Sequence, residues 1–207
     1  MQKERFIIIM AIAVVICLVE SSIRPYDRLT WVMEVAPVLL GLPVLVFSYR
    51  KYPLTTLAYV LIAVHAIVLI FGGKYTYARV PFGYWLQELL GTDRNPYDKI
   101  GHLMQGLVPT LLAREIFVRS KTISLKWLIN LIALCVAMTI SAFYELIEWA
   151  AALMLGQGAD EFLGLQGDEW DTQSDMFSAS IGALIVWIIL SKWHDRQIND
   201  RSDSRAW

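Results

Sequence analysis

Histidine and carboxylate side chains recur at helical spacing in three segments of the C-terminal half, NPYDKIGHLMQG, SAFYELIEWAA and GDEWDTQSDMFSASIGA. In the first segment Asp98, His102 and Gln105 follow one another at steps of four and three residues, which places them on one helical face. In the second segment Glu145 and Glu148 are three residues apart and share a face in the same way. Apolar residues flank both sets, and an ionisable group in such a setting is usually paired or functional.

The third segment carries two more carboxylates. Asp171 and Asp175 are four residues apart, and Ser178 and Gly182 follow at further helical steps. The structural alternative to a functional role for Asp171 is that it is the N-cap of the last predicted span. Asp175 lies one turn deeper and needs a partner. Ser178 and Gly182 are small enough to let another helix approach closely.

Several carboxylates and one imidazole make a ligand set that suits a divalent metal such as Mn, Fe, Zn or Mg. The sequence predicts His102 as the nitrogen ligand and Glu145 and Asp175 as oxygen ligands, with Asp98 orienting the His102 ring. A metal-bound water and a spare carboxylate would then suit hydrolysis. The candidate catalytic residues are Asp98, His102, Glu145, Glu148, Asp171 and Asp175.

Two other interpretations of the same residues stay open. In one, a structural polar cluster holds three helices together, with Asp98 serving as a cap. In the other, His102, Glu145 and Asp175 exchange protons in a transporter. Transporters commonly carry internal repeats, and no repeat is visible in this sequence. A metal or binding site is therefore the favoured interpretation.

Long apolar runs must position these residues, since 57% of the chain is hydrophobic and only 18% is charged. A helix needs about 20 apolar residues to cross a hydrocarbon core of about 30 Å. The sequence predicts an all-α, polytopic transmembrane bundle of about six helices in one domain, residues 1–193, followed by a polar cytoplasmic tail, residues 194–207. The predicted spans are residues 6–23, 29–49, 54–72, 100–118, 127–150 and 172–193.

The distribution of basic residues predicts the orientation of the bundle. With the N-terminus in the cytoplasm, the cytoplasmic segments hold twelve of the 18 Lys and Arg residues. The loop from Gly156 to Asp171, on the opposite side, holds five acidic residues and no basic one. Both termini are therefore predicted to be cytoplasmic, and the alternating directions of the last three spans bring the six candidate residues to the outer face.

Smaller features add four expectations. The loop from 73 to 96 contains YARVPFGYWLQELLG, which indicates a short helix in the membrane interface. Glu34 in the second span could reach the same outer cavity as the six candidates. His65 is expected to be a packed, hydrogen-bonded residue. Arg114 and Glu115 are expected to anchor the inner end of the fourth span by extending toward the interface.

The formal net charge of the chain indicates which kinds of partner it can bind. The formal net charge of -1 gives no basic surplus for nucleic acid. The expected contacts are membrane lipids, and the number of copies in an assembly is not predicted.

The three polar segments together resemble the YjdF family of bacterial inner-membrane proteins over about residues 95–183. More distantly, the D-K-x-x-H segment and the acidic positions after it are similar to VanZ-like membrane proteins, which are associated with glycopeptide resistance. In that comparison Asp98, His102, Glu145, Asp175 and Gly182 occupy the family's polar positions. The resemblance implies a multi-pass protein of the bacterial cell inner membrane and implies no particular reaction.

The predicted function is that of a multi-pass inner-membrane protein with a carboxylate and histidine site at its outer face. The site is expected to bind a divalent metal and to act on a lipid-linked or envelope substrate, or on another small molecule. The alternatives are a proton-coupled small-solute transporter and a non-catalytic membrane protein with a structural polar cluster. Whether the protein is an enzyme stays open.

Overall fold

The computed structural model describes residues 2–155 and 166–203, and every regular element among them is helical. The elements are α1 (Gln2–Ser22), α2 (Arg28–Ser48), α3 (Thr56–Tyr75), α4 (Pro81–Leu90), α5 (Tyr97–Ser120), α6 (Lys126–Leu155), α8 (Asp171–Ile185), η2 (Val186–Leu190) and α9 (Ser191–Asp203). Because η2 is a π-helical turn, α8, η2 and α9 form one continuous run of helix. The all-α bundle predicted from the sequence is confirmed.

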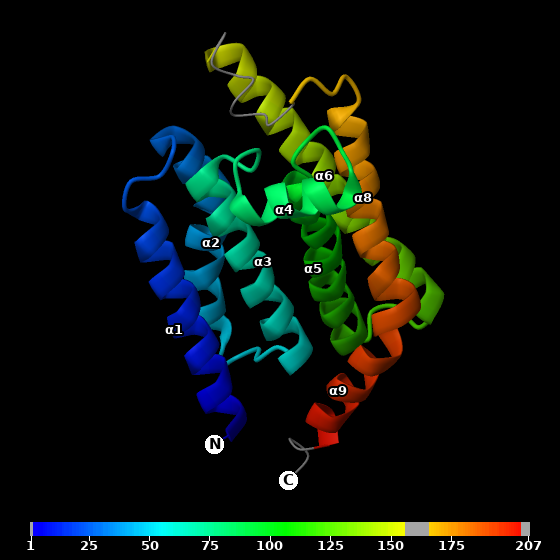
Figure 1. The fold of residues 1–207 in the computed structure, drawn as a ribbon. Coiled ribbons are helices and arrows are strands. Elements are labelled where there is room, and N and C mark those ends of the chain that lie inside the picture. Colours follow the sequence, from blue (N-terminus) through cyan, green and yellow to red (C-terminus); the bar gives the residue numbers. More distant parts are fainter. Residues whose placement is uncertain (1, 156–165, 204–207) are drawn as a thin grey trace.

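The long helices form two groups of three that meet along α3 and α5 (Figure 1). In the first group α1 and α2 each pack against α3, and in the second α5, α6 and α8 pack against one another. The short helix α4 lies across one end of the bundle, and both chain ends lie at the other. We call these the α4 end and the terminal end.

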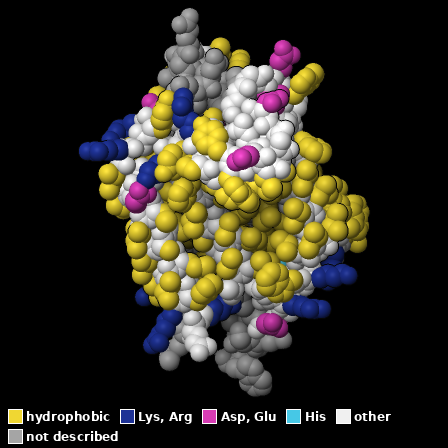
Figure 2. All heavy atoms as spheres, viewed as in Figure 1, with side chains coloured by type: hydrophobic (Ala, Val, Ile, Leu, Met, Phe, Trp, Pro, Cys, Tyr) yellow, Lys and Arg dark blue, Asp and Glu magenta, His cyan; other side chains and the backbone are white. Residues whose placement is uncertain are grey.

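Five of the six predicted spans correspond to helices that are long and apolar enough to cross a membrane: α1, α2, α3, α6 and the run from α8 into α9. The remaining predicted span, residues 100–118, corresponds to α5. This helix has 24 residues and is about 36 Å long at the usual rise, but it carries several ionisable side chains. It packs against α3, α6 and α8, which shield those side chains from lipid. Figure 2 shows the resulting apolar belt, with charged side chains gathered toward the two ends of the bundle.

Two glycines let α5 and α8 approach closely. A Cβ atom added at Gly106 would lie 1.8 Å from the carbonyl oxygen of Ala179, and one added at Gly182 would lie 2.0 Å from that of Leu103. Neither position can hold a side chain unless the helices separate. The small-residue role predicted for Gly182 is therefore confirmed, since it lets the backbone of α8 pack directly against that of α5.

The polar segment after Lys192 is largely helical, since α9 continues to Asp203. His194 is completely buried and Ile198 nearly so, because one face of α9 packs against the bundle. Low hydropathy over the whole segment conceals these inward-facing residues. Residues 204–207 of the predicted tail lie outside the described residues.

The prediction that Arg114 and Glu115 extend toward the interface is wrong, because both are buried. Arg114 donates from Nε to Asn130 Oδ1 at 2.8 Å and from Nη2 to Asp195 Oδ1 at 2.5 Å. Its Nη1 lies 3.0 Å from Nδ1 of His194. These contacts tie α5 to α6 and α9 at the terminal end.

Glu115 accepts hydrogen bonds from three elements. The backbone N–H of Thr55 donates to Oε1 at 2.9 Å, and the Thr55 hydroxyl donates to Oε2 at 2.8 Å. Arg119 Nη1 donates to Oε1 at 3.0 Å, and Nε2 of His194 lies 3.1 Å from Oε2. Since Thr55 is the N-cap of α3, this one carboxylate joins the start of α3 to α5 and α9.

Replacing Glu115 by alanine should destabilise the bundle by about 3–5 kcal/mol, because it leaves the buried donors of Thr55 and His194 without their acceptor. Denaturant unfolding in detergent measures the effect. Glu88→Ala, at an exposed position on α4, is the control. The assignment fails if the two variants unfold at the same denaturant concentration.

Candidate metal centre

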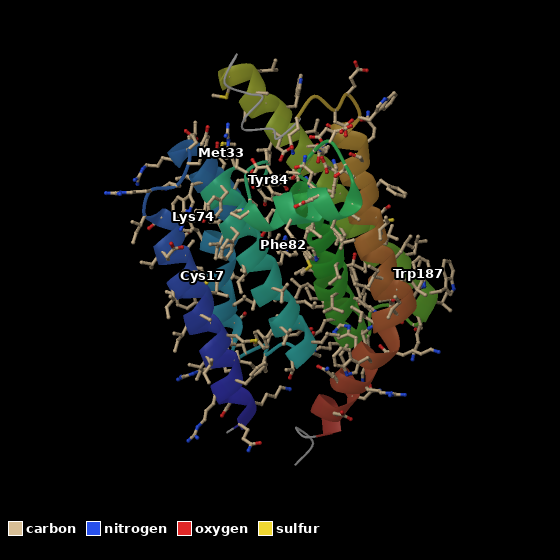
Figure 3. All side chains as sticks on the ribbon, viewed as in Figure 1. Cys17, Met33, Lys74, Phe82, Tyr84 and Trp187 are labelled. Atoms are coloured by element: carbon tan, nitrogen blue, oxygen red, sulfur yellow. The ribbon has the colours of Figure 1, made fainter. Side chains whose placement is uncertain are left out.

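The six residues singled out by the sequence converge at the α4 end, where α5 and α8 begin and the last turns of α6 pass beside them. They are Asp98, His102, Glu145, Glu148, Asp171 and Asp175. Five of them are buried, and Glu148 is partly buried. Figure 3 shows oxygen-bearing side chains crowded near the start of α8, close to α4 with its labelled Phe82 and Tyr84.

Three of the six form a compact group. His102 Nε2 lies 3.5 Å from Oδ1 of Asp98 and 3.8 Å from Oδ1 of Asp175. One ligating atom from each residue lies within 4.8 Å of those of the other two. We call Asp98, His102 and Asp175 the triad.

Glu145 lies on the other side of the imidazole ring. Its Oε1 is 3.7 Å from His102 Nδ1, and Nδ1 is itself 3.0 Å from Oε1 of Gln105. An Nδ1–H that donates to Gln105 leaves the lone pair of Nε2 directed at Asp98 and Asp175. Two carboxylates and a lone pair then face one another, an arrangement that needs a positive charge between them.

The distances suit a metal ion in that position. A tetrahedral ion with ligand bonds of about 2.1 Å holds its ligand atoms about 3.4 Å apart. The separations of 3.5 and 3.8 Å from His102 Nε2 are close to this value and longer than most hydrogen bonds. Two carboxylates and one imidazole also match the donor set of Zn²⁺ or Mn²⁺.

Lys99 closes the α8 side of the triad. Its Nζ donates to Oδ1 of Asp175 at 2.7 Å, to the hydroxyl of Ser174 at 2.6 Å and to Oδ1 of Asp171 at 2.9 Å. Asp175 is therefore shared between Lys99 and His102, and Lys99 fixes the position of its carboxylate.

The alternative in which Asp171 is the N-cap of its helix is wrong, because Trp170 occupies that position and Asp171 is the first helical residue. Its Oδ1 pairs with Nη1 of Arg94 at 2.7 Å. The same nitrogen donates to Asp168 Oδ2 at 2.7 Å. A hydrogen bond from the backbone N–H of Trp170 and the nearby charge of Arg94 hold the pKa of the Asp168 carboxyl below its ordinary value.

Negative charge outweighs permanent positive charge in this region. Six carboxylates lie in the cluster or line the adjoining cavity: Glu34, Asp98, Glu145, Glu148, Asp171 and Asp175. Among the described residues that contact them, Arg94 and Lys99 supply the permanent positive charges. Unbalanced buried carboxylates are costly, so the site favours a bound cation or bound protons.

A cavity of about 160 Å³ adjoins the triad. It is lined by Asp98 and His102 and continues along α5 as far as Pro109. Pro37 of α2 and Ile140 of α6 also line it, and both are exposed. The cavity therefore opens between α2 and α6, close to the middle of both helices, where a membrane-spanning bundle faces lipid.

Other polar groups face the same cavity. The Tyr144 hydroxyl donates to Glu34 Oε2 at 2.9 Å and so joins α6 to α2, and both residues line the cavity. The expectation that Glu34 reaches the same cavity as Asp98 and His102 is confirmed. The expectation for His65 is wrong at one atom, because its buried Nε2 has no hydrogen-bond partner among the residues that the structure describes.

Comparison with known proteins identifies the family. The family described as "Predicted membrane protein (DUF2238)" matches residues 6–196 of the chain. The chain belongs to this DUF2238 family. It is also 54% identical over 188 residues to the inner membrane protein YjdF of Escherichia coli (strain K12), with 91% of this chain and 90% of the relative covered. No solved structure matches the chain.

The resemblance to the YjdF family seen in the three polar segments is thus confirmed, and this member of the DUF2238 family is a membrane protein. The family description gives a location and no reaction.

Sequence reasoning missed Arg94 and Lys99 as members of the cluster and counted them only as loop charges. Their position in the sequence could have identified them. Buried carboxylates need nearby cations, and Arg94 lies four residues before Asp98 while Lys99 directly follows it. Tyr144 was also missed, although it directly precedes Glu145.

Proposed function

We propose that this protein binds one divalent metal ion at Asp98, His102 and Asp175 and uses it to hydrolyse a lipid-borne substrate. The observation that carries the proposal is the approach of two carboxylate oxygens to within 3.5 and 3.8 Å of one imidazole nitrogen. The geometry favours Asp98 over Glu145 as the third ligand, since Glu145 lies beside the opposite ring nitrogen.

A divalent ion with three protein ligands keeps a position for water and supplies a Lewis acid and a nucleophile. Glu148 is our candidate general base, because it is only partly buried and lines the cavity beside Asp98 and His102. Lys99 holds Asp175 in place, and Gln105 holds the His102 ring.

The shape of the cavity supports a lipid substrate. Asp98 and His102 of the triad line its polar side, while Leu69, Pro37 and Ile140 give it an apolar side that opens between α2 and α6. A lipid could place its polar group at the triad and leave its chain in the bilayer. A soluble substrate would not enter through an opening that faces the lipid near the middle of α2 and α6.

The proposed setting is the bacterial inner membrane with both termini in the cytoplasm, as the basic residues favour. The α4 end, with the triad, then lies at the outer face. The acidic loop that supports this orientation runs from Gly156 to Asp171, and its residues 156–165 lie outside the described residues.

Ile140→Trp should block the opening and lower the amount of lipid that co-purifies with the protein, while metal binding stays unchanged. Lipid extraction with mass spectrometry and elemental analysis of one preparation measure both. Phe143→Trp is the matched control, because Phe143 is exposed on the same helix and does not line the cavity. Equal lipid in both variants would argue against entry from the membrane.

A proton-coupled transporter is the second candidate, favoured by Glu34 and His65, which add titratable groups along the cavity. The buried core around and beyond Pro109 counts against it, because Val108 and Leu111 of α5 belong to an apolar cluster there. A pH-dependent flux into liposomes that is lost in Glu145→Gln would support transport instead.

A further inference from the structure

A second cavity, of about 260 Å³, lies at the terminal end, where α5 ends, α6 begins and α9 passes beside them. Its ionisable lining residues are Arg114, Lys121, Lys126 and Asp195. Three positive charges against one negative charge leave an excess of two positive charges. The cavity shares no residue with the one at the α4 end.

Arg114 is the fixed part of this cavity. It is buried, and its hydrogen bonds to Asn130, His194 and Asp195 use three of its five N–H donors. Those partners hold the guanidinium rigidly, so the remaining donors can bind an anion without first losing side-chain freedom. A rigid guanidinium is well suited to the oxygens of a phosphate group.

Lys121 is the C-cap residue of α5 and Lys126 is the first residue of α6. Both line the cavity with Arg114 and are exposed. Only Lys126 has an ion-pair partner among the described residues, Asp195 at 3.4 Å. Two exposed ammonium groups beside a buried guanidinium make an anion site that a ligand can enter from outside.

The surroundings indicate that this anion belongs to a lipid. Leu125 and Trp127 are the sequence neighbours of the lining residue Lys126, and Trp193 lies two residues before the lining residue Asp195. All three are more than half exposed, and tryptophans are typical of the membrane interface. Val118 and Ile129 give the cavity an apolar wall. At the membrane interface, the basic residues of this cavity would contact a phospholipid headgroup, and its apolar wall would contact the first carbons of the acyl chains.

We propose that this cavity binds the phosphate of an anionic phospholipid headgroup. The assignment rests on the juxtaposition of Arg114, Lys121 and Lys126 at the interface and is independent of the metal site at the α4 end. Basic pockets between membrane helices are known to take such headgroups. Bound lipid would link the α5–α6 loop to α9.

The experiment compares full-length protein in detergent, by native mass spectrometry, with phosphatidylglycerol and with phosphatidylethanolamine. Wild type should bind phosphatidylglycerol more tightly, and added salt should weaken that binding. The double variant Lys121→Asn with Lys126→Gln should bind it roughly tenfold more weakly. Asparagine is chosen because Lys121 has a φ of 53°, which asparagine tolerates.

Lys51→Gln with Lys192→Gln is the matched control, since it removes the same charge from exposed lysines that do not line the cavity. The control should bind phosphatidylglycerol like wild type. Equal weakening in both double variants, or none in either, overturns the proposal. Inorganic phosphate supplied alone should compete poorly, and phosphate that binds as tightly as the lipid would overturn the lipid assignment. Thermal unfolding of each variant confirms that it is folded.

Discussion

Replacing Gly106 by leucine should prevent α5 and α8 from packing and leave almost no folded protein. The added Cβ alone would lie 1.8 Å from the Ala179 carbonyl oxygen and 2.5 Å from its carbonyl carbon. Backbone atoms cannot move aside as a side-chain tip can, so the two helices would have to separate. We expect a loss above about 4 kcal/mol, the range of exceptional core substitutions.

Separation of α5 and α8 would also dismantle the triad, because Asp98 and His102 come from α5 and Asp175 comes from α8. Size-exclusion profiles and thermal unfolding of the purified protein measure the effect. Gly41→Leu in α2 is the control, since a Cβ there meets nothing within 4 Å and leucine favours a helix over glycine. A monodisperse Gly106→Leu protein that unfolds like wild type would refute the packing described here.

His102→Ala should weaken binding of Mn²⁺ by at least about 100-fold, because even a residue that only orients a ligand costs 10–100-fold. His102 supplies the nitrogen of the triad, and two carboxylates without it make a poor site. Calorimetric titration of chelator-treated protein with Mn²⁺ measures the affinity. His65→Ala is the control, because His65 lines the cavity and lies outside the triad.

The same variant separates a metal site from a structural cluster. For a metal site, Mn²⁺ at 100 times its dissociation constant should stabilise wild type by about 2.7 kcal/mol and His102→Ala hardly at all. Without metal, His102→Ala should still lose about 2–4 kcal/mol, because it removes a buried side chain and its 3.0 Å contact with Gln105. Wild type that is equally stable with and without Mn²⁺ would favour the structural cluster.

The helices and the location of the site could be predicted because both depend on local spacing. Apolar runs of sufficient length indicated the spans, and four-residue steps placed Asp98 with His102 and Asp171 with Asp175. Helices that alternate in direction bring those faces to one end whatever their exact packing. Gly182 could be predicted for the same reason, because its lack of a side chain is visible in the sequence.

Contacts between distant residues could not be predicted in this way. Glu115 meets Thr55 and His194, which are 60 and 79 residues away, so its burial depends on how α3 and α9 pack. The polar composition of α9 concealed the inward-facing His194. Likewise, spacing gives no information on which nitrogen of His102 faces Asp98 and which faces Glu145, since side-chain rotamers decide that.

Pulsed electron paramagnetic resonance of the Mn²⁺-loaded protein tests the proposed triad most directly, because it detects a nitrogen nucleus bonded to the ion. Coordination by His102 Nε2 predicts coupling to one imidazole nitrogen, and the coupling should persist in His65→Ala. Tightly bound Mn²⁺ with no nitrogen coupling in wild type would contradict coordination at Asp98, His102 and Asp175.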